Sequence, residues 1–134
     1  MLQTDNRLTK VRDFNLVMKY GRWANGQFLD LKYLRLAQIQ PYFPKKEDPE
    51  KFKNQLKLAF TVGVKISKSA VKRNRIKRQM REVIRLLIKA GALRAGFYLL
   101  LVVRKNILDK SYAEISGEIE LLLKRATLWM TRLA

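Results

Sequence analysis

Residues 56–66 carry the pattern that most limits how this chain can fold. From Leu56 to Ile66, apolar side chains alternate with polar or small ones at every second position. Such alternation is typical of a strand with one buried face, because successive side chains of a strand point to opposite sides of the sheet. Gly63 falls inside the run and is a position where such a strand can bend. The chain therefore contains a sheet, which argues against a mostly helical fold.

A helix with two different sides is expected directly after this strand, over Ser69–Ala90. Ser69 suits the N-cap position and Gly91 suits the end of the helix. Apolar residues recur at helical spacing along one side. They are Ile76, Met80, Val83 and Leu87.

Other segments supply further elements around this strand and helix. We expect a helix over Arg7–Tyr20 that ends at a left-handed Gly21, a strand over Phe28–Leu36 and a buried strand over Phe97–Arg104. A last helix runs from Ser111 to about Met130, where Ser111 and Glu114 fit a capping box and Ile115, Ile119, Leu122 and Ala126 form the inner face. Residues 40–54 hold all three prolines and read as a surface loop. The order suggests one sheet covered on one face by helices.

Composition narrows the class of function. The 134 residues suit one domain, and they contain no cysteine and no histidine, which excludes disulfides, zinc ribbons and a Ser-His-Asp triad. The net charge of +18 points to a polyanionic partner, either nucleic acid or an anionic membrane. The first residues lack an apolar signal core, and the longest apolar run, Phe97–Val103, is too short to span a bilayer. We therefore expect a cytoplasmic protein with no membrane partner.

The positive charge is concentrated before and along the second helix. Residues 51–81 include eleven basic residues and no acidic one. A charge run is most often a solvated surface, but such a surface normally mixes signs. Here Arg73, Lys77 and Arg81 repeat like charges at i,i+4, which destabilises a helix unless phosphates neutralise them. Within the helix itself arginine predominates over lysine, which favours bidentate phosphate contacts from side chains expected to point into solvent.

Several large side chains near the N-terminus allow two interpretations. Each can belong to the core, or the group can form a platform on which single-stranded nucleic acid stacks. The candidates are Phe14, Met18, Trp23, Phe28 and Tyr33. The sequence alone leaves both interpretations open.

Residues 67–82, SKSAVKRNRIKRQMRE, resemble the signature of the bacterial ribonuclease P protein component. That protein is the small basic subunit of the ribonucleoprotein that removes the 5′ leader from precursor tRNA. Arg73-Asn74-Arg75, followed by Ile76-Lys77-Arg78, is similar to the family's Arg-Asn-Arg motif. The resemblance extends over nearly the whole chain in the right order, through Asn6-Arg7-Leu8, Asp13-Phe14 and Gly21, and then Ala24-Asn25 and Gln27-Phe28.

The resemblance implies a fold, and it implies different roles for the RNA and for the protein. The fold is a single-domain α+β (α/β) sandwich, with the order helix–three strands–helix–strand–helix and a left-handed crossover. One further strand is then needed before the second helix, near Trp23 or at the bend at Gly63. The RNA carries out the chemistry with Mg²⁺, so the protein supplies no catalytic residue. The implied partners are the ribonuclease P RNA and precursor tRNA, with no protein partner required.

The resemblance also implies two binding surfaces. The helix with the Arg-Asn-Arg motif faces the catalytic RNA, and a cleft between the first helix and the sheet receives the 5′ leader. The RNA-facing set is Lys68, Lys72, Arg73, Asn74, Arg75, Lys77, Arg78 and Arg81. The cleft set is Lys10, Phe14, Met18 and Asn25.

Three departures from the family pattern are visible. The loop at Lys68–Ala70 is shorter than usual, and the segment over residues 38–55 is longer, as a surface insertion would be. Met18 stands where an aromatic residue is common, although a thioether can still contact a base.

Two other classes of nucleic-acid-binding protein fit the sequence less well. A structural ribosomal protein would be expected to carry an extended basic tail, whereas here the basic residues fall on folded elements. A helix-turn-helix DNA-binding protein would be mostly helical, which the strands disfavour. No paired carboxylates on a regular element suggest a hydrolytic metal site within the protein.

Overall fold

The computed structural model describes residues 6–38 and 54–129 of the chain. Three α-helices, four strands and two short 3-10 helices make up this part of it. In chain order they are α1 (Val11–Tyr20), β1 (Arg22–Asn25), β2 (Leu29–Arg35), η2 (Leu36–Gln38), β3 (Leu56–Thr61), α3 (Ala70–Lys89), β4 (Phe97–Val103), η4 (Lys105–Asp109) and α4 (Tyr112–Arg125).

The four strands form one mixed sheet in the order β1-β2-β4-β3. β1 pairs with β2 and β2 with β4 in antiparallel fashion, whereas β3 and β4 are parallel. A parallel pair needs a crossover connection, and α3 provides it. The fold is a single α+β domain, as expected. The further strand before α3 is β1, which contains Trp23, and it is not formed at Gly63.

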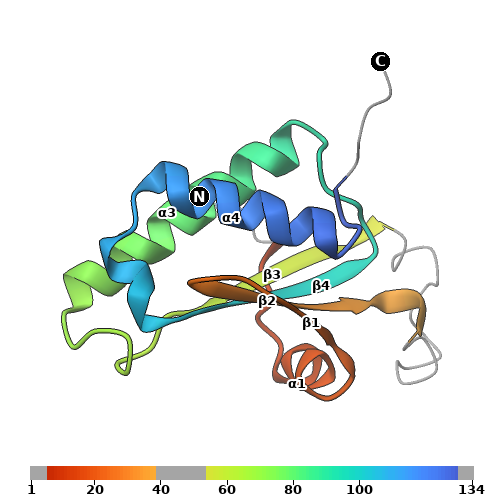
Figure 1. Cartoon of the computed structure of the whole chain (residues 1–134). Coiled ribbons are helices and arrows are strands. Elements are labelled where there is room, and N and C mark those ends of the chain that lie inside the picture. Colours follow the sequence, from red (N-terminus) through yellow and green to blue (C-terminus); the bar gives the residue numbers. More distant parts are fainter. Residues whose placement is uncertain (1–5, 39–53, 130–134) are drawn as a thin grey trace.

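Helices cover both faces of the sheet, and the expectation that they cover only one was wrong. α3 and α4 lie on one face and α1 on the other (Figure 1). The reason is β4, whose continuous apolar sequence buries side chains on both sides. Leu99 and Leu101 belong to the cluster beneath α3 and α4, and Tyr98 and Leu100 to the cluster beneath α1. A strand of this kind requires a cover on each face.

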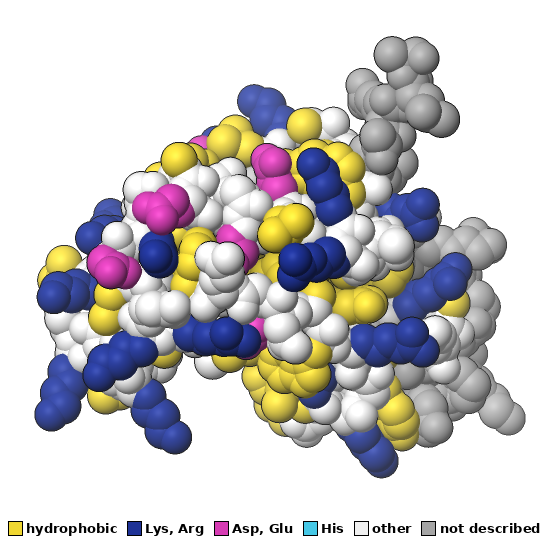
Figure 2. Space-filling model, viewed as in Figure 1, with side chains coloured by type: hydrophobic (Ala, Val, Ile, Leu, Met, Phe, Trp, Pro, Cys, Tyr) yellow, Lys and Arg dark blue, Asp and Glu magenta, His cyan; other side chains and the backbone are white. Residues whose placement is uncertain are grey.

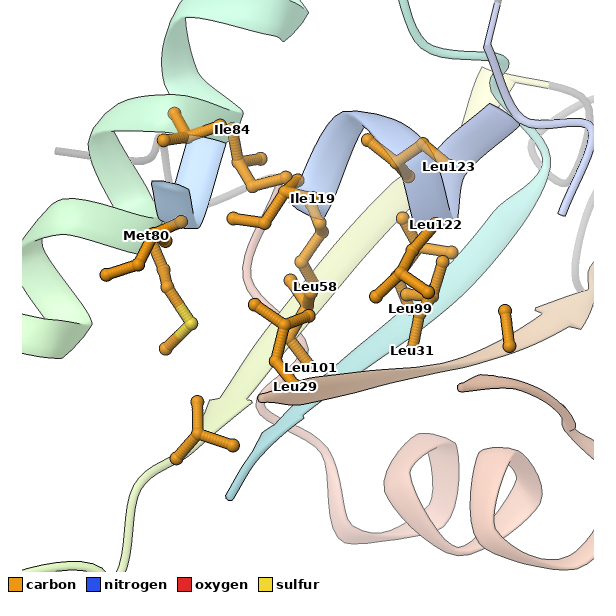
Figure 3. Packing of buried hydrophobic residues seen from close by; sticks show 14 of the residues in the cluster. Leu29, Leu31, Leu58, Met80, Ile84, Leu99, Leu101, Ile119, Leu122 and Leu123 are labelled. Atoms are coloured by element: carbon orange, nitrogen blue, oxygen red, sulfur yellow. The ribbon is translucent and has the colours of Figure 1, made fainter. Parts of the chain in front are cut away.

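The larger core lies between the sheet and the α3–α4 layer (Figure 3). Met80 and Ile84 enter it from α3, and Ile119, Leu122 and Leu123 from α4. All five side chains are almost fully buried. The apolar side of α3 is therefore fixed against the core, which leaves its basic side facing outward.

β3 is shorter than the alternating sequence suggests. It ends at Thr61, and residues 64–66 form a turn in which Val64 is 65% exposed. Pairing explains the difference, because Thr61 lies opposite Val102 and β4 ends one residue later. A longer β3 would have no partner for its backbone groups.

The first helix begins at Val11, four residues later than expected at Arg7. The preceding segment instead extends along the edge strand β3, where Leu8 N donates to Leu58 O at 2.8 Å. Gly21 ends the helix as expected, but its φ of −68° is not left-handed. Glycine fits here because a Cβ would lie 2.5 Å from the carbonyl oxygen of Val17.

The other helix ends follow the expected capping residues. Ser69 Oγ accepts from Lys72 N at 3.4 Å, and Ser111 forms a full capping box with Glu114. α4 ends at Arg125, before the expected end near Met130, because the chain turns at Thr127, which has a positive φ of 59°. Met130 and residues 39–53, most of the expected surface loop, lie outside the described residues. None of the described helices is long and apolar enough to cross a bilayer.

Candidate nucleic-acid interface

The basic side of α3 and the turn before it form the first candidate surface. We name it the α3 basic face. Its members are Lys68, Lys72, Arg73, Asn74, Arg75, Lys77, Arg78 and Arg81. Five of the eight side chains are exposed, and Arg73, Lys77 and Arg81 are half-buried. Figure 2 shows Lys and Arg side chains gathered at the left edge of the molecule, over the start of α3.

Two arginines of the α3 basic face are held by backbone carbonyls. Arg73 donates to Ser67 O at 3.0 Å, and Arg75 donates to Leu108 O at 2.7 Å. Arg75 is exposed, as expected for a side chain that points to solvent, whereas Arg73 is half-buried, and both also contact the protein backbone. A guanidinium has five N–H donors, so each arginine keeps donors for a ligand while one bond fixes its position. Both are thereby oriented before any ligand arrives.

Glu82 is the sole acidic residue of α3. Arg85 donates to both of its carboxylate oxygens, at 2.6 and 3.0 Å. These hydrogen bonds lower the pKa of Glu82, while desolvation acts in the opposite direction, so the carboxylate is charged at neutral pH. The helix α3 thus carries no acid over its first three turns, and its single acid beyond them is paired.

The second candidate surface lies on the other side of the sheet, around α1. Phe14 and Met18 are one helical turn apart on α1 and are 36% and 46% exposed. Trp23, on the neighbouring β1, is also 46% exposed. We name these three residues the α1 platform. Phe28 is instead buried in the larger core, and Tyr33 packs against that core, so the five candidates divide into three surface residues and two core residues.

Two members of the expected cleft set lie toward the edges of this surface. Lys10 is exposed at the N-cap of α1. Asn25 is exposed at the end of β1, and its backbone carbonyl accepts from Arg125 of α4 at 3.0 Å. Phe14 and Met18 thus share one stretch of α1, whereas Asn25 lies where β1 meets the opposite layer.

A buried lysine, which sequence reasoning missed, supports the α1 platform from below. Lys32 of β2 is 6% exposed, and its Nζ donates to Met18 O at 2.6 Å. The same Nζ lies 5.0 Å from the centre of the Trp23 ring, within cation–π range. In the sequence, Lys32 is a polar residue within the mostly apolar segment Phe28–Leu36, which has no regular pattern. Only its pairing opposite Trp23 could have indicated that it supports the α1 platform.

A second buried charge, also missed, joins α4 to the turn between β1 and β2. Glu118 accepts from the backbone N–H groups of Gln27, Phe28 and Leu29 at 2.5, 3.0 and 3.0 Å. A Cβ on Gly26 would lie 2.8 Å from this carboxylate. Glu118 therefore fixes the strand pair that carries Trp23 and Asn25.

A groove of about 290 Å³ lies between the α3 basic face and the N-terminal segment. Lys77 and Arg81 line it from α3, and Arg7 from the N-terminal segment, with Leu58 and Phe60 of β3 below. It therefore brings three cations together at the edge of the sheet. Among the described residues, no three His, Cys, Asp or Glu side chains group as metal ligands.

Comparison with known proteins identifies the family of the chain. Residues 2–127 match the family described as Ribonuclease P. The chain belongs to the ribonuclease P protein family. Curated ribonuclease P protein components are similar to it, one from a Synechococcus strain at 34% identity over 96% of this chain and 86% of its own length. Another, from Clostridium kluyveri, is 39% identical over 92% of this chain and 96% of its own.

Solved ribonuclease P proteins share the fold. The Staphylococcus aureus protein superimposes with a TM-score of 0.71 at 22% identity, covering 100% of this chain and 99% of the other. The Thermotoga maritima protein does so with a TM-score of 0.65 at 24% identity, covering 89% and 96%. The family match and the curated relatives make the chain the protein component of ribonuclease P, a ribonucleoprotein endoribonuclease, with an RNA as partner.

Proposed function

We propose that the protein binds the catalytic RNA of ribonuclease P through the α3 basic face and holds the 5′ leader of precursor tRNA on the α1 platform. In this way it assists removal of the leader to give the mature 5′ end of tRNA. The observation that carries the proposal is the α3 basic face, which is free of acidic residues, outward-facing and partly oriented by Ser67 and Leu108.

Electrostatics supports the assignment of the α3 basic face to RNA. Two polyanions, the catalytic RNA and its substrate, repel each other, and fixed cations on a protein reduce that repulsion. The helix is anchored in the core by its apolar side, so its cations are presented on a rigid element. Arginines already oriented by one hydrogen bond lose less side-chain freedom when they contact a phosphate.

The exposure of the α1 platform supports its assignment to single-stranded RNA. Exposed rings beside cations bind unpaired bases by stacking, which tolerates any base. Phe14 and Trp23 supply the rings, and Met18 supplies a polarisable thioether between them in sequence. Lys10, at the start of α1, supplies a cation for the leader backbone.

The chemical step belongs to the RNA in this proposal. Mg²⁺ would be held mainly by RNA and substrate phosphates and would supply the activated water that phosphodiester hydrolysis requires. The protein's own groups position the leader and thereby the scissile phosphate. The proposal places the protein in the cytoplasm and requires no protein partner.

Reconstitution tests the proposal. The protein is mixed with a bacterial ribonuclease P RNA and precursor tRNA at low Mg²⁺, and 5′ cleavage is measured. We expect cleavage to be restored by the wild-type protein and by Arg94→Gln, which removes one exposed cation from the loop beyond the far end of α3. Arg78→Gln removes one exposed cation from the α3 basic face and should weaken the effect. Equal loss in both variants, or no restoration at all, would contradict the proposal.

A further inference from the structure

A hollow separate from the groove beside β3 lies between α3 and the start of α4. Its volume is about 390 Å³, and it opens broadly to solvent. Arg75, Arg78, Gln79 and Glu82 line it from α3, and Tyr112 from the first residue of α4. The hollow thus combines two guanidinium groups, an amide, a carboxylate and a phenol ring within one small area.

The side-chain amide oxygen of Gln79 lacks a hydrogen-bond donor among the described residues. This oxygen, Oε1, is buried. Buried polar atoms without a partner are uncommon in native structures and mark places where a ligand or water completes the bonding. Gln79 also lines the hollow, and its oxygen would reach a ligand there after a rotation of the side chain. Gln79 thus brings to the wall of the hollow an acceptor that lacks a donor.

The carboxylate of Glu82 makes the hollow different from a plain phosphate site. It is charged at neutral pH and repels a phosphate placed beside it. Arg85 uses one lone pair on each carboxylate oxygen, at 2.6 and 3.0 Å, and a carboxylate has about four such sites. Both oxygens thus remain able to accept from a ligand. Glu82 and Gln79, which both line the hollow, thus carry three acceptor oxygens between them.

The other walls fit the rest of a nucleotide. Tyr112 is 39% exposed and offers a ring for stacking. Arg75 is fixed by its bond to Leu108 O and retains further donors, and Arg78 is exposed beside it. A phosphate at this end of the hollow would meet two guanidinium groups.

We propose that this hollow binds one unpaired guanine of the RNA partner, stacked on Tyr112, with its Watson–Crick edge on Glu82 and Gln79 and its phosphate on Arg75 and Arg78. The number of N–H donors on the base matches the number of acceptor oxygens on Glu82 and Gln79. Guanine presents three N–H hydrogens on this edge, one on N1 and two on N2, whereas adenine and cytosine present two and uracil one. Three acceptors therefore favour guanine. The inference rests on the proposed RNA binding and adds a base preference to it.

Mononucleotide titration tests the inference on the free protein. GMP, IMP, AMP and inorganic phosphate are titrated while the backbone amide resonances of residues 75–82 and 111–113 are followed by NMR. IMP is the decisive probe, because it differs from GMP only by the missing N2 amine. We expect GMP to bind about tenfold more tightly than IMP, as loss of a hydrogen bond to a charged or buried acceptor predicts. Inorganic phosphate should bind without shifting the Tyr112 resonances.

Two variants separate the acceptors from the cations. Gln79→Leu should abolish most of the GMP preference, leave phosphate binding unchanged and raise the melting temperature, since an unpartnered buried oxygen is removed. Glu82→Gln should also reduce the preference for GMP over IMP. Equal affinities for GMP, IMP and phosphate, or a preference unchanged in Gln79→Leu, would overturn the inference.

The outcomes also distinguish this inference from the proposed function. Restored tRNA cleavage without any guanine preference would overturn the guanine site and leave the proposed function intact. A guanine preference in a protein that fails to restore cleavage would support the site and contradict the proposed function.

Discussion

The buried ammonium of Lys32 donates a 2.6 Å hydrogen bond to the carbonyl of Met18 in the last turn of α1. A cation at this end of a helix stabilises it, because the final carbonyls carry partial negative charge. Since the same ammonium lies 5.0 Å from the Trp23 ring, one side chain ties α1, β2 and β1 together. The spacing of the α1 platform therefore depends on Lys32.

Lys32→Met tests this dependence. The variant keeps the aliphatic length but loses the bond to Met18 O, so we expect the free energy of unfolding to fall by about 1–3 kcal/mol. Leader binding should weaken with it, whereas affinity for the catalytic RNA should stay near that of the wild type. Chemical denaturation and filter binding measure the two effects. An unchanged stability would show that the bond contributes nothing.

Binding to the catalytic RNA should depend strongly on salt. If the α3 basic face contacts about six phosphates, a plot of log K against log salt has a slope of roughly −4 to −5. Arg78→Gln should make the slope less steep by about one, and Arg94→Gln should leave it unchanged. A wild-type slope near −1 would mean that the face is merely solvated.

Arg73→Ala and Arg75→Ala should each weaken RNA binding by about 1–2 kcal/mol, as loss of a charge-assisted contact predicts. Their melting temperatures should fall only slightly, because each loses one hydrogen bond at the surface. Arg75→Lys keeps the charge and loses the planar fork, so its affinity should lie between those of the wild type and Arg75→Ala. A large drop in melting temperature with normal RNA affinity would assign these arginines to the fold alone.

Phe14→Ala should weaken binding of precursor tRNA with a leader by about 1–3 kcal/mol through lost stacking. Mature tRNA, which has no leader, is the control and should bind as before. The exposure of Phe14 predicts a nearly normal thermal melt, unlike the loss expected for a fully buried phenylalanine. Equal weakening for substrates with and without a leader would contradict this role.

Glu118→Gln should destabilise the protein by about 1–3 kcal/mol. An amide has one acceptor oxygen where the carboxylate has two, so the three backbone N–H groups of Gln27, Phe28 and Leu29 cannot all be satisfied. Thermal denaturation measures the effect. Glu120→Gln, a half-buried position on the same helix, is the matched control and should have a much smaller effect.

Local patterns predicted the elements of this fold well. Ser69 and Ser111 mark helix starts through bonds to residues only three positions away, and β4 is visible as a continuous apolar run. Two of the predictions that were wrong concern element ends that are set by pairing with residues distant in the sequence. The end of β3 is set by the length of β4, and the start of α1 by the bond from Leu8 to Leu58. Neither partner is near in sequence.

The candidate site also has features that the sequence predicts and features that only the tertiary structure reveals. The α3 basic face follows from helical periodicity, which places like charges on one side. The hydrogen bonds from Arg73 to Ser67 and from Arg75 to Leu108 could be found only in the structure, since the second joins residues 33 positions apart. Lys32 and Glu118 are charged residues that sequence reasoning would place in solvent, and only tertiary contacts reveal them as buried supports.

The pairing of residues 6–8 with β3 has a consequence for self-association. β3 is one of the two outer strands of the sheet, and an uncovered outer strand offers its N–H and C=O groups to a second chain, which is how sheets aggregate. Here Leu8 N and Asn6 Nδ2 bond the carbonyls of Leu58 and Leu56, each at 2.8 Å. The N-terminal segment thus covers part of the β3 edge and hinders a second copy from pairing there.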